Sequence, residues 1–449
     1  MTGHKAVGIH VFAGGFTRGV IDAGWKVDHQ LEVHGFGLET TQRMNAVNTI
    51  NTPAAEWPPA KEMPALMAFG NPRCTAFSTI TSGDRYNESN AHGAWAKQTC
   101  DIHELCNYTA GNYDFIVWES VQQAYKTGRE LVDYLVKEVF YPKHYRIAHL
   151  FLNAASFGNT QQRKRYFFVA YRDCYRFNIE PPSISPYQDF LYDAIWSMRD
   201  RPTRESQLYN GADDYDYDCY TRLTDDEKHV VPNLPNGWDL GMMAKWGGYE
   251  MLTPKQQLTW DWRASEMPFS MHGIYRLNWL RPSPTLHSSC ARWIHPILHR
   301  PLTIGELCTI MGWPDGVIPA GPHPAAQVAK GICPSVGTWL ARQVELSYEH
   351  HWGKDDWESS YCDKKCEWQG GDTDGLEKTF DLTRYTGKIF NEERYDASAL
   401  RRHRFNVDGS TGRLVRSWKE IAEQSRRYEG GGGGMGGSPS EPELELSCE

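Results

Sequence analysis

The sequence of 449 residues lacks the features of membrane, secreted and strongly basic proteins. It contains no apolar run that approaches the length of a membrane span, and its N-terminus has no signal-peptide pattern. We therefore expect a cytoplasmic protein. Basic residues are not in excess, because 47 Lys and Arg stand against 56 Asp and Glu, for a net charge of -9. This balance excludes a generally basic chain, although a local basic cleft remains compatible with it.

The chain also lacks a regular cysteine pattern. Its 11 cysteines show no repeating spacing, which in a cytoplasmic protein indicates free thiols and not a disulfide framework. Cys362 and Cys366 form a single C-x3-C pair. Because no second pair stands at metal-binding spacing, the sequence predicts no metal site.

An α/β pattern begins at the N-terminus. Residues 6–11 form a short apolar run that predicts a strand, and a glycine turn from Phe12 to Phe16 follows it. A helix is predicted over 17–23 and a second strand over 27–31, which ends at Glu32. A glycine turn lets a backbone approach a ligand closely, and an acid ending the next strand can accept ribose hydroxyls. The pattern favours a nucleoside-bearing cofactor, with a solvated strand end as the alternative for Glu32.

A cysteine follows the next predicted strand. The apolar run 63–69 breaks into the turn Gly70-Asn71-Pro72, and Cys74 stands at the end of that turn. Ligands and reactive groups collect at the carboxyl ends of strands in open α/β sheets. Positive charge activates thiolates, and Arg73 is adjacent. A buried structural cysteine is the alternative. The polar segment 79–94 is typical of a mobile loop that closes over a substrate.

Further polar side chains stand at predicted strand ends. The buried strand 115–118 delivers Glu119, and a carboxylate at such a position needs a partner or a role. Gln161, Arg163 and Arg165 alternate along an extended segment and are predicted to point to one side. Two guanidiniums on one side make a clamp for an anion or a polar base. A solvated basic edge strand is the alternative.

Changes in composition and in helical periodicity divide the chain into predicted units. Residues 173–271 are rich in Tyr, Trp, Pro and Asp and show poor helical periodicity, after which the α/β pattern returns. The near-pure glycine run and acidic end are predicted to be disordered. The predicted units are a catalytic and cofactor-binding domain over 1–172, an irregular domain over 173–271, a return to the catalytic domain over 272–352, an extension over 353–429 and a tail over 430–449.

Taken in order, these motifs resemble those of the C5-cytosine-specific DNA methyltransferases. Residues 70–78 (GNPRCTAFS) resemble the family's Gly-x-Pro-Pro-Cys-Gln-x-Phe-Ser, and residues 119–121 are similar to its Glu-Asn-Val. Residues 161–165 resemble its Gln-x-Arg-x-Arg, and residues 281–285 its Arg-x-x-Pro-Thr. The glycine turn 12–16 resembles its cofactor turn.

The resemblance implies an α/β, Rossmann-like S-adenosylmethionine-dependent methyltransferase domain with a smaller target-recognition domain at 173–271. It implies that Cys74 adds to C6 of a flipped cytosine, that protonated Glu119 contacts N3, and that Arg163 and Arg165 hold the O2 side and orient Glu119. The implied cofactor-binding residues are Phe12, Ala13, Gly14, Gly15, Phe16, Glu32, Val33, Pro72 and Gly331. The implied DNA contacts are Arg73, Ser78, Gln161 and Thr285.

The implied partner is double-stranded DNA, bound by a monomer, and a cognate restriction nuclease is compatible with the resemblance. The chain departs from the family where Arg73 replaces a proline, Thr75 a glutamine and Ile332 an asparagine. Ile332 removes a polar contact to the donor, so a cytosine C5-modifying enzyme with an altered donor stays open, with Arg73 pairing to an anionic donor group. A catalytically inactive DNA-binding regulator and a tRNA substrate also stay open.

Overall fold

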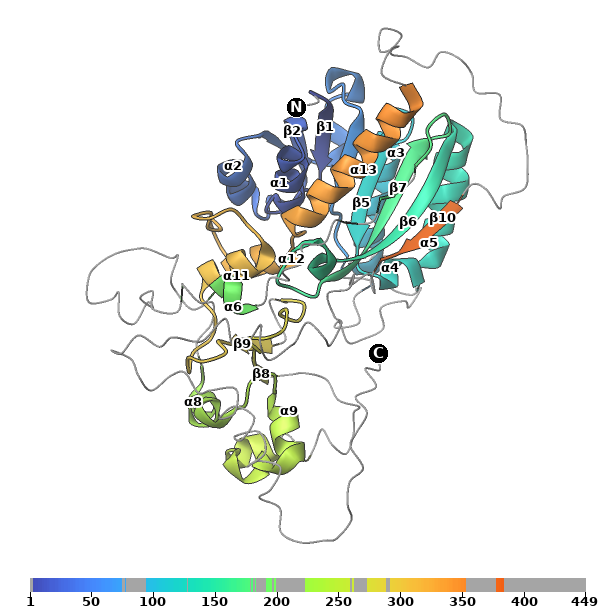
Figure 1. Cartoon of the computed structure of the whole chain (residues 1–449). Helices are drawn as coiled ribbons and strands as arrows, with labels where there is room; N and C mark the ends of the chain where they lie inside the picture. The colour runs from blue at the N-terminus through green and yellow to red at the C-terminus, as the bar shows by residue number, and fades with distance from the viewer. Residues whose placement is uncertain are drawn as a thin grey trace.

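The computed structural model describes residues 3–74, 77, 94–126, 128–177, 179–180, 182, 191–195, 198, 223–258, 261, 273–287, 291–352 and 377–382. Its centre is an eight-stranded sheet in the order β10-β6-β7-β5-β4-β1-β2-β3 (Figure 1). The strands are β1 Lys5–Ile9, β2 Lys26–Glu32, β3 Asn48–Asn51, β4 Met67–Gly70, β5 Phe115–Ser120, β6 Tyr145–Asn153, β7 Lys164–Arg172 and β10 Glu377–Asp381.

The strand directions define a Rossmann-like sheet. The pairs β1–β2, β1–β4, β2–β3, β4–β5 and β6–β10 are parallel, whereas β7 runs antiparallel between β5 and β6. The order reverses at β1, which is the switch point where ligands bind in open α/β sheets. The predicted α/β, Rossmann-like architecture is confirmed.

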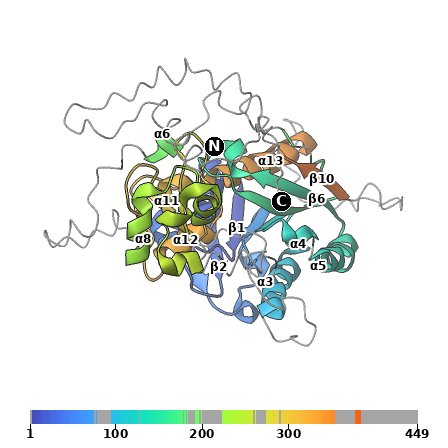
Figure 2. The ribbon, with the colours of Figure 1, turned by 90° about the horizontal axis from the view of Figure 1, so that it is seen from below.

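Buried side chains alternate along the strands and supply two cores. On β5, Phe115 and Val117 face one core, while Ile116 and Trp118 face the other. The sheet therefore lies between two helical layers, with α13 on one side and α3, α4 and α5 on the other (Figure 2). These layers contain α1 Gly15–Asp22, α2 Leu38–Asn45 and α13 Pro334–Trp352 on the first face, and α3 Ala94–Thr109, α4 Gln123–Lys126 and α5 Arg129–Tyr134 on the second.

A close backbone contact joins the two ends of the catalytic fold. A Cβ on Gly15 would lie 2.2 Å from the Ile332 carbonyl oxygen, and one on Gly19 would lie 2.2 Å from that of Pro334. Only glycine permits this approach. The contact packs α1 against α13 and brings residues 331–334 onto the start of the chain.

The smaller unit has its own core below the sheet in Figure 1. It contains α8 Asp225–Val230, α9 Leu240–Met243 and the parallel strands β8 Gly273–Arg276 and β9 Ala291–Ile294. Ile274 and Ile294 belong to this core, so the unit extends past the predicted boundary at residue 271. Conversely, α6 Leu191–Ile195 packs in the catalytic core with α11 Ile304–Met311.

The predicted extension 353–429 contributes β10 to the catalytic sheet, where it pairs in parallel with β6. Within the described residues, no helix is long and apolar enough to cross a membrane. The predicted tail 430–449 and the loop 79–93 lie outside the described residues.

Candidate active site

The cysteine turn, residues 71–74, is fixed to neighbouring strand ends. The Asn71 amide donates to the His10 carbonyl at 3.1 Å, and its side chain donates to the Lys330 carbonyl at 3.4 Å. The Phe77 amide donates to the Cys74 carbonyl at 3.0 Å, and the Phe77 ring is buried. These contacts hold the half-buried Cys74 at the carboxyl edge of β4.

A buried carboxylate and a guanidinium meet at the same edge. Arg165 Nε lies 2.9 Å from Glu119 Oε1, and Glu119 is 2% exposed. Antiparallel pairing of β5 and β7 sets Glu119 opposite Phe167, which brings Arg165 to the end of β5. Burial raises the pKa of Glu119, while Arg165 and then Arg163 lower it. The raised pKa favours a carboxyl group that can carry a proton.

The pKa of the Cys74 thiol depends on the same charged groups. Burial raises the pKa of Cys74, the Glu119 charge raises it further, and Arg165 and Arg163 oppose both. Arg73 is instead committed to Asp101 on α3, through Nε at 2.5 Å and Nη2 at 2.8 Å. The expectation that Arg73 activates the thiol is therefore corrected, because Arg165 is the main cation acting on it. Arg73 is oriented by Asp101 in this structure, and its predicted DNA contact stays a prediction.

Arg163 and Gln161 are buried in a seam between the two halves of the chain. Arg163 Nη2 donates to the carbonyls of Ala329 and Gly331, both at 2.8 Å. Gln161 is fully buried, and its Oε1 accepts the Leu286 amide at 3.0 Å. Of the two arginines expected to orient Glu119, Arg165 makes the ion pair, whereas Arg163 binds backbone carbonyls of the seam. The expected contact of Arg163 with the O2 side of the base stays a prediction. The burial of Gln161 corrects its expected contact with DNA.

The same seam contains residues 281–285, which resemble the family's Arg-x-x-Pro-Thr. Thr285 Oγ1 donates to the Gln162 carbonyl at 2.7 Å, and the Ser283 amide donates to the Thr160 carbonyl at 2.7 Å. Thr285 is half-buried. Ser78, the remaining predicted DNA contact, lies outside the described residues.

The glycine turn, residues 12–16, is tied to the end of β2 by Glu32. Its carboxylate accepts the Phe12 amide at 3.2 Å, and the amides of Val33 and His34 at 3.0 and 3.1 Å. Burial raises the pKa of Glu32, and these three amides oppose the shift. The partly exposed Phe12 ring packs edge-on against Phe36, with centroids 6.1 Å apart. An acid and an aromatic edge therefore lie together at the switch point.

Other predicted cofactor residues have packing roles. Phe16 is 2% exposed and packs against Phe69 and Phe167, so its ring belongs to the core. A Cβ on Gly14 would lie 2.1 Å from Thr41 Oγ1. Glycine is therefore required here by a contact within the protein and not by the approach of a ligand. Ala13 and Pro72 are buried, Val33 is half-buried, and the Gly331 carbonyl accepts Arg163.

Ile332 is 3% exposed and packs in the core. It lines a small internal cavity of about 10 Å³ together with Leu152, Ala154, Arg163, Arg165, Phe167, Cys333 and Val336. The side chain that replaces the family's asparagine therefore fills space beside Arg163 and Arg165.

Sequence reasoning missed Asp101 and Phe36. Asp101 lies in the polar stretch before residue 109, where no local pattern marks it as the partner of Arg73. Phe36 follows Glu32 by four residues, and its position in the turn after the acid could have indicated an aromatic cofactor contact.

The fold and the site together define a Rossmann-like enzyme with a cysteine, a buried carboxyl group and an arginine at its switch-point edge. A model of the C-5 cytosine-specific DNA methylase family matches residues 45–345, a range that contains Cys74, Glu119 and Arg165. The chain belongs to this family and is a DNA cytosine methyltransferase, which confirms the predicted resemblance and enzyme class. The family implies a methyl donor and a DNA substrate.

One of the similar solved structures shares the fold, with a TM-score above 0.5. A protein from E. coli, described as a DNA modification methyltransferase encoded within a prophage, is 14% identical, with 77% of this chain and 99% of that chain covered and a TM-score of 0.55. A mutant of Spodoptera frugiperda DNMT2 is 13% identical, with 76% and 99% covered and a TM-score of 0.46. The Entamoeba histolytica methyltransferase EhMeth is 9% identical, with 77% and 99% covered and a TM-score of 0.47. No curated protein was found to match this chain.

Proposed function

We propose that the enzyme transfers a methyl group from S-adenosylmethionine to C5 of a flipped cytosine in double-stranded DNA, with Cys74 as the nucleophile. The observation that carries the proposal is the Glu119–Arg165 pair, 2.9 Å apart, acting electrostatically on the Cys74 thiol. A cysteine with a protonatable acid is the pair of groups that addition to a pyrimidine ring needs. Flipping the base out of the duplex costs on the order of a few kcal/mol.

The reaction starts from the weak nucleophilicity of cytosine C5. The Cys74 thiolate forms a bond to C6, and the displaced electron pair moves through the ring to N3, which takes the Glu119 proton. C5 is then an enamine carbon, which is the nucleophile that a bound methyl donor would require. After methylation, transfer of the C5 proton to water would re-form the C5=C6 bond and expel the Cys74 thiolate, and N3 would return its proton to Glu119. Arg165 holds the Glu119 carboxyl group in place throughout.

The residues at the glycine turn fit the donor. S-adenosylmethionine, when bound, supplies an electrophilic methyl group. A carboxylate can accept about four hydrogen bonds, and that of Glu32 accepts three from backbone amides. One acceptor site therefore remains for a ribose hydroxyl. The partly exposed ring of Phe12, with Phe36 beside it, offers an apolar edge for adenine.

The alternatives have less support. An altered anionic donor would have to pair with Arg73, yet Arg73 already contacts both carboxylate oxygens of Asp101. The family assignment favours an enzyme over an inactive regulator, and DNA over tRNA. We also propose action as a monomer in the cytoplasm, with a cognate nuclease as a candidate partner.

The test is covalent trapping on duplex DNA that contains 5-fluorocytosine, in the presence of S-adenosylmethionine. The missing C5 proton prevents release, so the wild type should form a stable adduct and Cys74→Ala none. Cys333→Ala is the matched control, because Cys333 is a second buried cysteine near the same arginines and should still trap. Mass spectrometry of nucleosides from ordinary DNA should show 5-methylcytosine. Equal adduct from Cys74→Ala, or another added mass, would overturn the proposal.

A further inference from the structure

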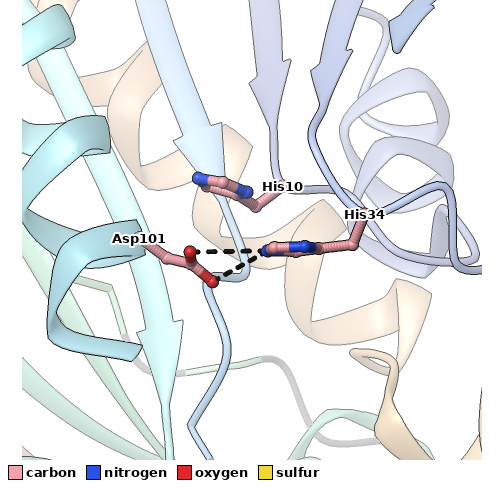
Figure 3. A group of neighbouring side chains, drawn as sticks. All are labelled: His10, His34 and Asp101. Carbon is pink, nitrogen blue, oxygen red and sulfur yellow. Dashed lines mark hydrogen bonds and ion pairs between the residues drawn. The ribbon is translucent and has the colours of Figure 1, made fainter. Parts of the chain in front are cut away.

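Three metal-ligating side chains converge beside the glycine turn, from separate elements. His10 follows β1, His34 follows β2, and Asp101 lies on α3 (Figure 3). One ligand atom from each lies within 4.8 Å of the other two. None of these residues has a role in the proposed chemistry. Asp101 pairs with Arg73 and with His34, but these contacts leave His10 unexplained.

His10 supplies the strongest sign of a ligand. It is 2% exposed, and neither ring nitrogen has a hydrogen-bond partner. Its ring stacks on that of His34, with centroids 6.1 Å apart and planes inclined by 18°, and the edge of Trp57 packs against it. Buried polar groups are almost always paired, and leaving one unpaired costs free energy. Coordination of an ion through one ring nitrogen would remove that cost.

The spacing suits a small cation. Ligands about 2.0–2.1 Å from a tetrahedral zinc ion lie about 3.3 Å from one another. His34 Nε2 and Asp101 Oδ2 are already 3.2 Å apart. The His10 nitrogen must therefore approach the other two ligand atoms by a distance on the order of 1.5 Å.

Arg73 is compatible with coordination. Ligating carboxylates are commonly held by hydrogen bonds from outside the metal shell, and Arg73 Nε and Nη2 hold Asp101 in this way. A carboxylate has about four acceptor sites, so two remain. The positive charge of Arg73 cancels the negative charge of Asp101, so the ligands have no net charge. Ligands without net charge still bind zinc, because the zinc ion of carbonic anhydrase is held by three histidines.

We propose that His10, His34 and Asp101 bind one divalent transition-metal ion of the zinc type. Two imidazole nitrogens and one carboxylate oxygen favour such ions over Mg²⁺ and Ca²⁺, which prefer oxygen ligands. The ion joins the turn that carries Phe12 to the turn that follows β2, and through Arg73 it braces Cys74. The site goes beyond the proposed function, and its test needs no methyl transfer.

The experiment uses the full chain, stripped of metal, with Cys362→Ser and Cys366→Ser to remove the C-x3-C pair. Titration with Zn²⁺ in a calorimeter should show one site, and Mg²⁺ at the same concentration should give no heat of binding. Zinc-edge X-ray absorption of the one-equivalent sample should show nitrogen and oxygen neighbours at about 2.0–2.2 Å and no sulfur at about 2.3 Å. A sulfur shell, or absence of binding, overturns the proposal.

Variants assign the site. His34→Ala removes a side chain that is 31% exposed, so folding should survive, and Zn²⁺ affinity should fall by more than about tenfold. His29→Ala is the matched control on β2, the strand that precedes His34. Its ring contacts Asn48, and the change should leave affinity unchanged. Unchanged affinity in His34→Ala would place the ion elsewhere and refute the site, while the absorption spectrum of the parent protein tests it even if a variant misfolds.

Discussion

At the scale of single residues, the proposed roles of Cys74 and Glu119 determine how the reaction rate depends on pH. Burial raises the pKa of both Cys74 and Glu119, yet the proposed addition needs the thiolate and the protonated carboxyl group together. Between the two pKa values the thiolate fraction grows with pH as fast as the protonated carboxyl fraction shrinks. The productive population is therefore constant in that window and falls on both sides.

The first prediction follows from this balance. The second-order rate of adduct formation on 5-fluorocytosine DNA should be flat between the two pKa values in the wild type. In Glu119→Gln the rate should be much lower and should rise by about tenfold per pH unit until Cys74 is ionised, because the opposing titration is gone. The measurement is trapping rate against pH at limiting DNA. Parallel profiles for wild type and variant would remove Glu119 as the proton donor.

Residue types were predictable to different degrees. Cys74 and Glu119 stand at the carboxyl ends of short apolar strands. Because the carboxyl ends of parallel strands meet at one edge of a sheet, their proximity could be inferred from the sequence. The alternation of Gln161, Arg163 and Arg165 could not reveal that residues 283–286 cover the first two. Likewise Asp101, the partner of Arg73, is fixed by how α3 packs, and packing partners distant in sequence leave no local signal.

At the scale of elements, one carboxylate adds side-chain contacts to the backbone pairing of β10 with β6. Glu377 accepts His149 Nε2 at 2.8 Å, Arg129 Nη2 at 3.2 Å and the Tyr141 hydroxyl at 3.3 Å. The hydrogen bond from buried His149 is the main reason why the pKa of Glu377 is lowered from 4.5 to about 2. A short, charged strand with exposed Lys378 and Thr379 resembles a loop in sequence, which is why its place was not predicted.

The second prediction concerns this strand. Glu377→Gln should weaken the docking of β10 by about 1.5–3 kcal/mol, the range for a hydrogen bond to a charged group. Hydrogen exchange of the amides in β10 and β6 measures it. Lys378→Gln, an exposed change on the same strand, should leave protection as it is. Equal protection in the two variants would contradict the role of Glu377.

The same contact has a defined pH dependence. The folded-state pKa of Glu377 lies below its unfolded value, so its contribution is complete above pH 4.5 and is lost as pH falls towards 2. Protection of β10 should decline in that window in the wild type and change less in Glu377→Gln, after correction for intrinsic exchange rates.

At the scale of the whole molecule, the smaller unit packs around a core of its own, separate from the two cores of the catalytic sheet. The catalytic sheet carries Cys74, Glu119 and Glu32, whereas the smaller unit, with its core from Val230 to Ile294, carries none of the proposed chemistry. With a net charge of -9, the chain can bind DNA only through local basic surface. We therefore infer that the smaller unit reads the DNA sequence while the sheet performs methylation.

The last prediction tests this division by a graft. Residues 223–294, transferred into the prophage-encoded relative from E. coli, should bring the site preference of this chain with them, because base contacts and not phosphate contacts specify sequence. The control transfers residues 191–198 alone, which pack in the catalytic core and should leave the preference of the recipient unchanged. Sequencing of methylated positions in a random duplex library reads the outcome, and affinity should fall steeply with salt in both chimeras because phosphate contacts dominate binding. If a folded, active graft of 223–294 methylates the recipient's old site, sequence recognition lies in the catalytic domain or in segments outside the transferred range, and the division fails.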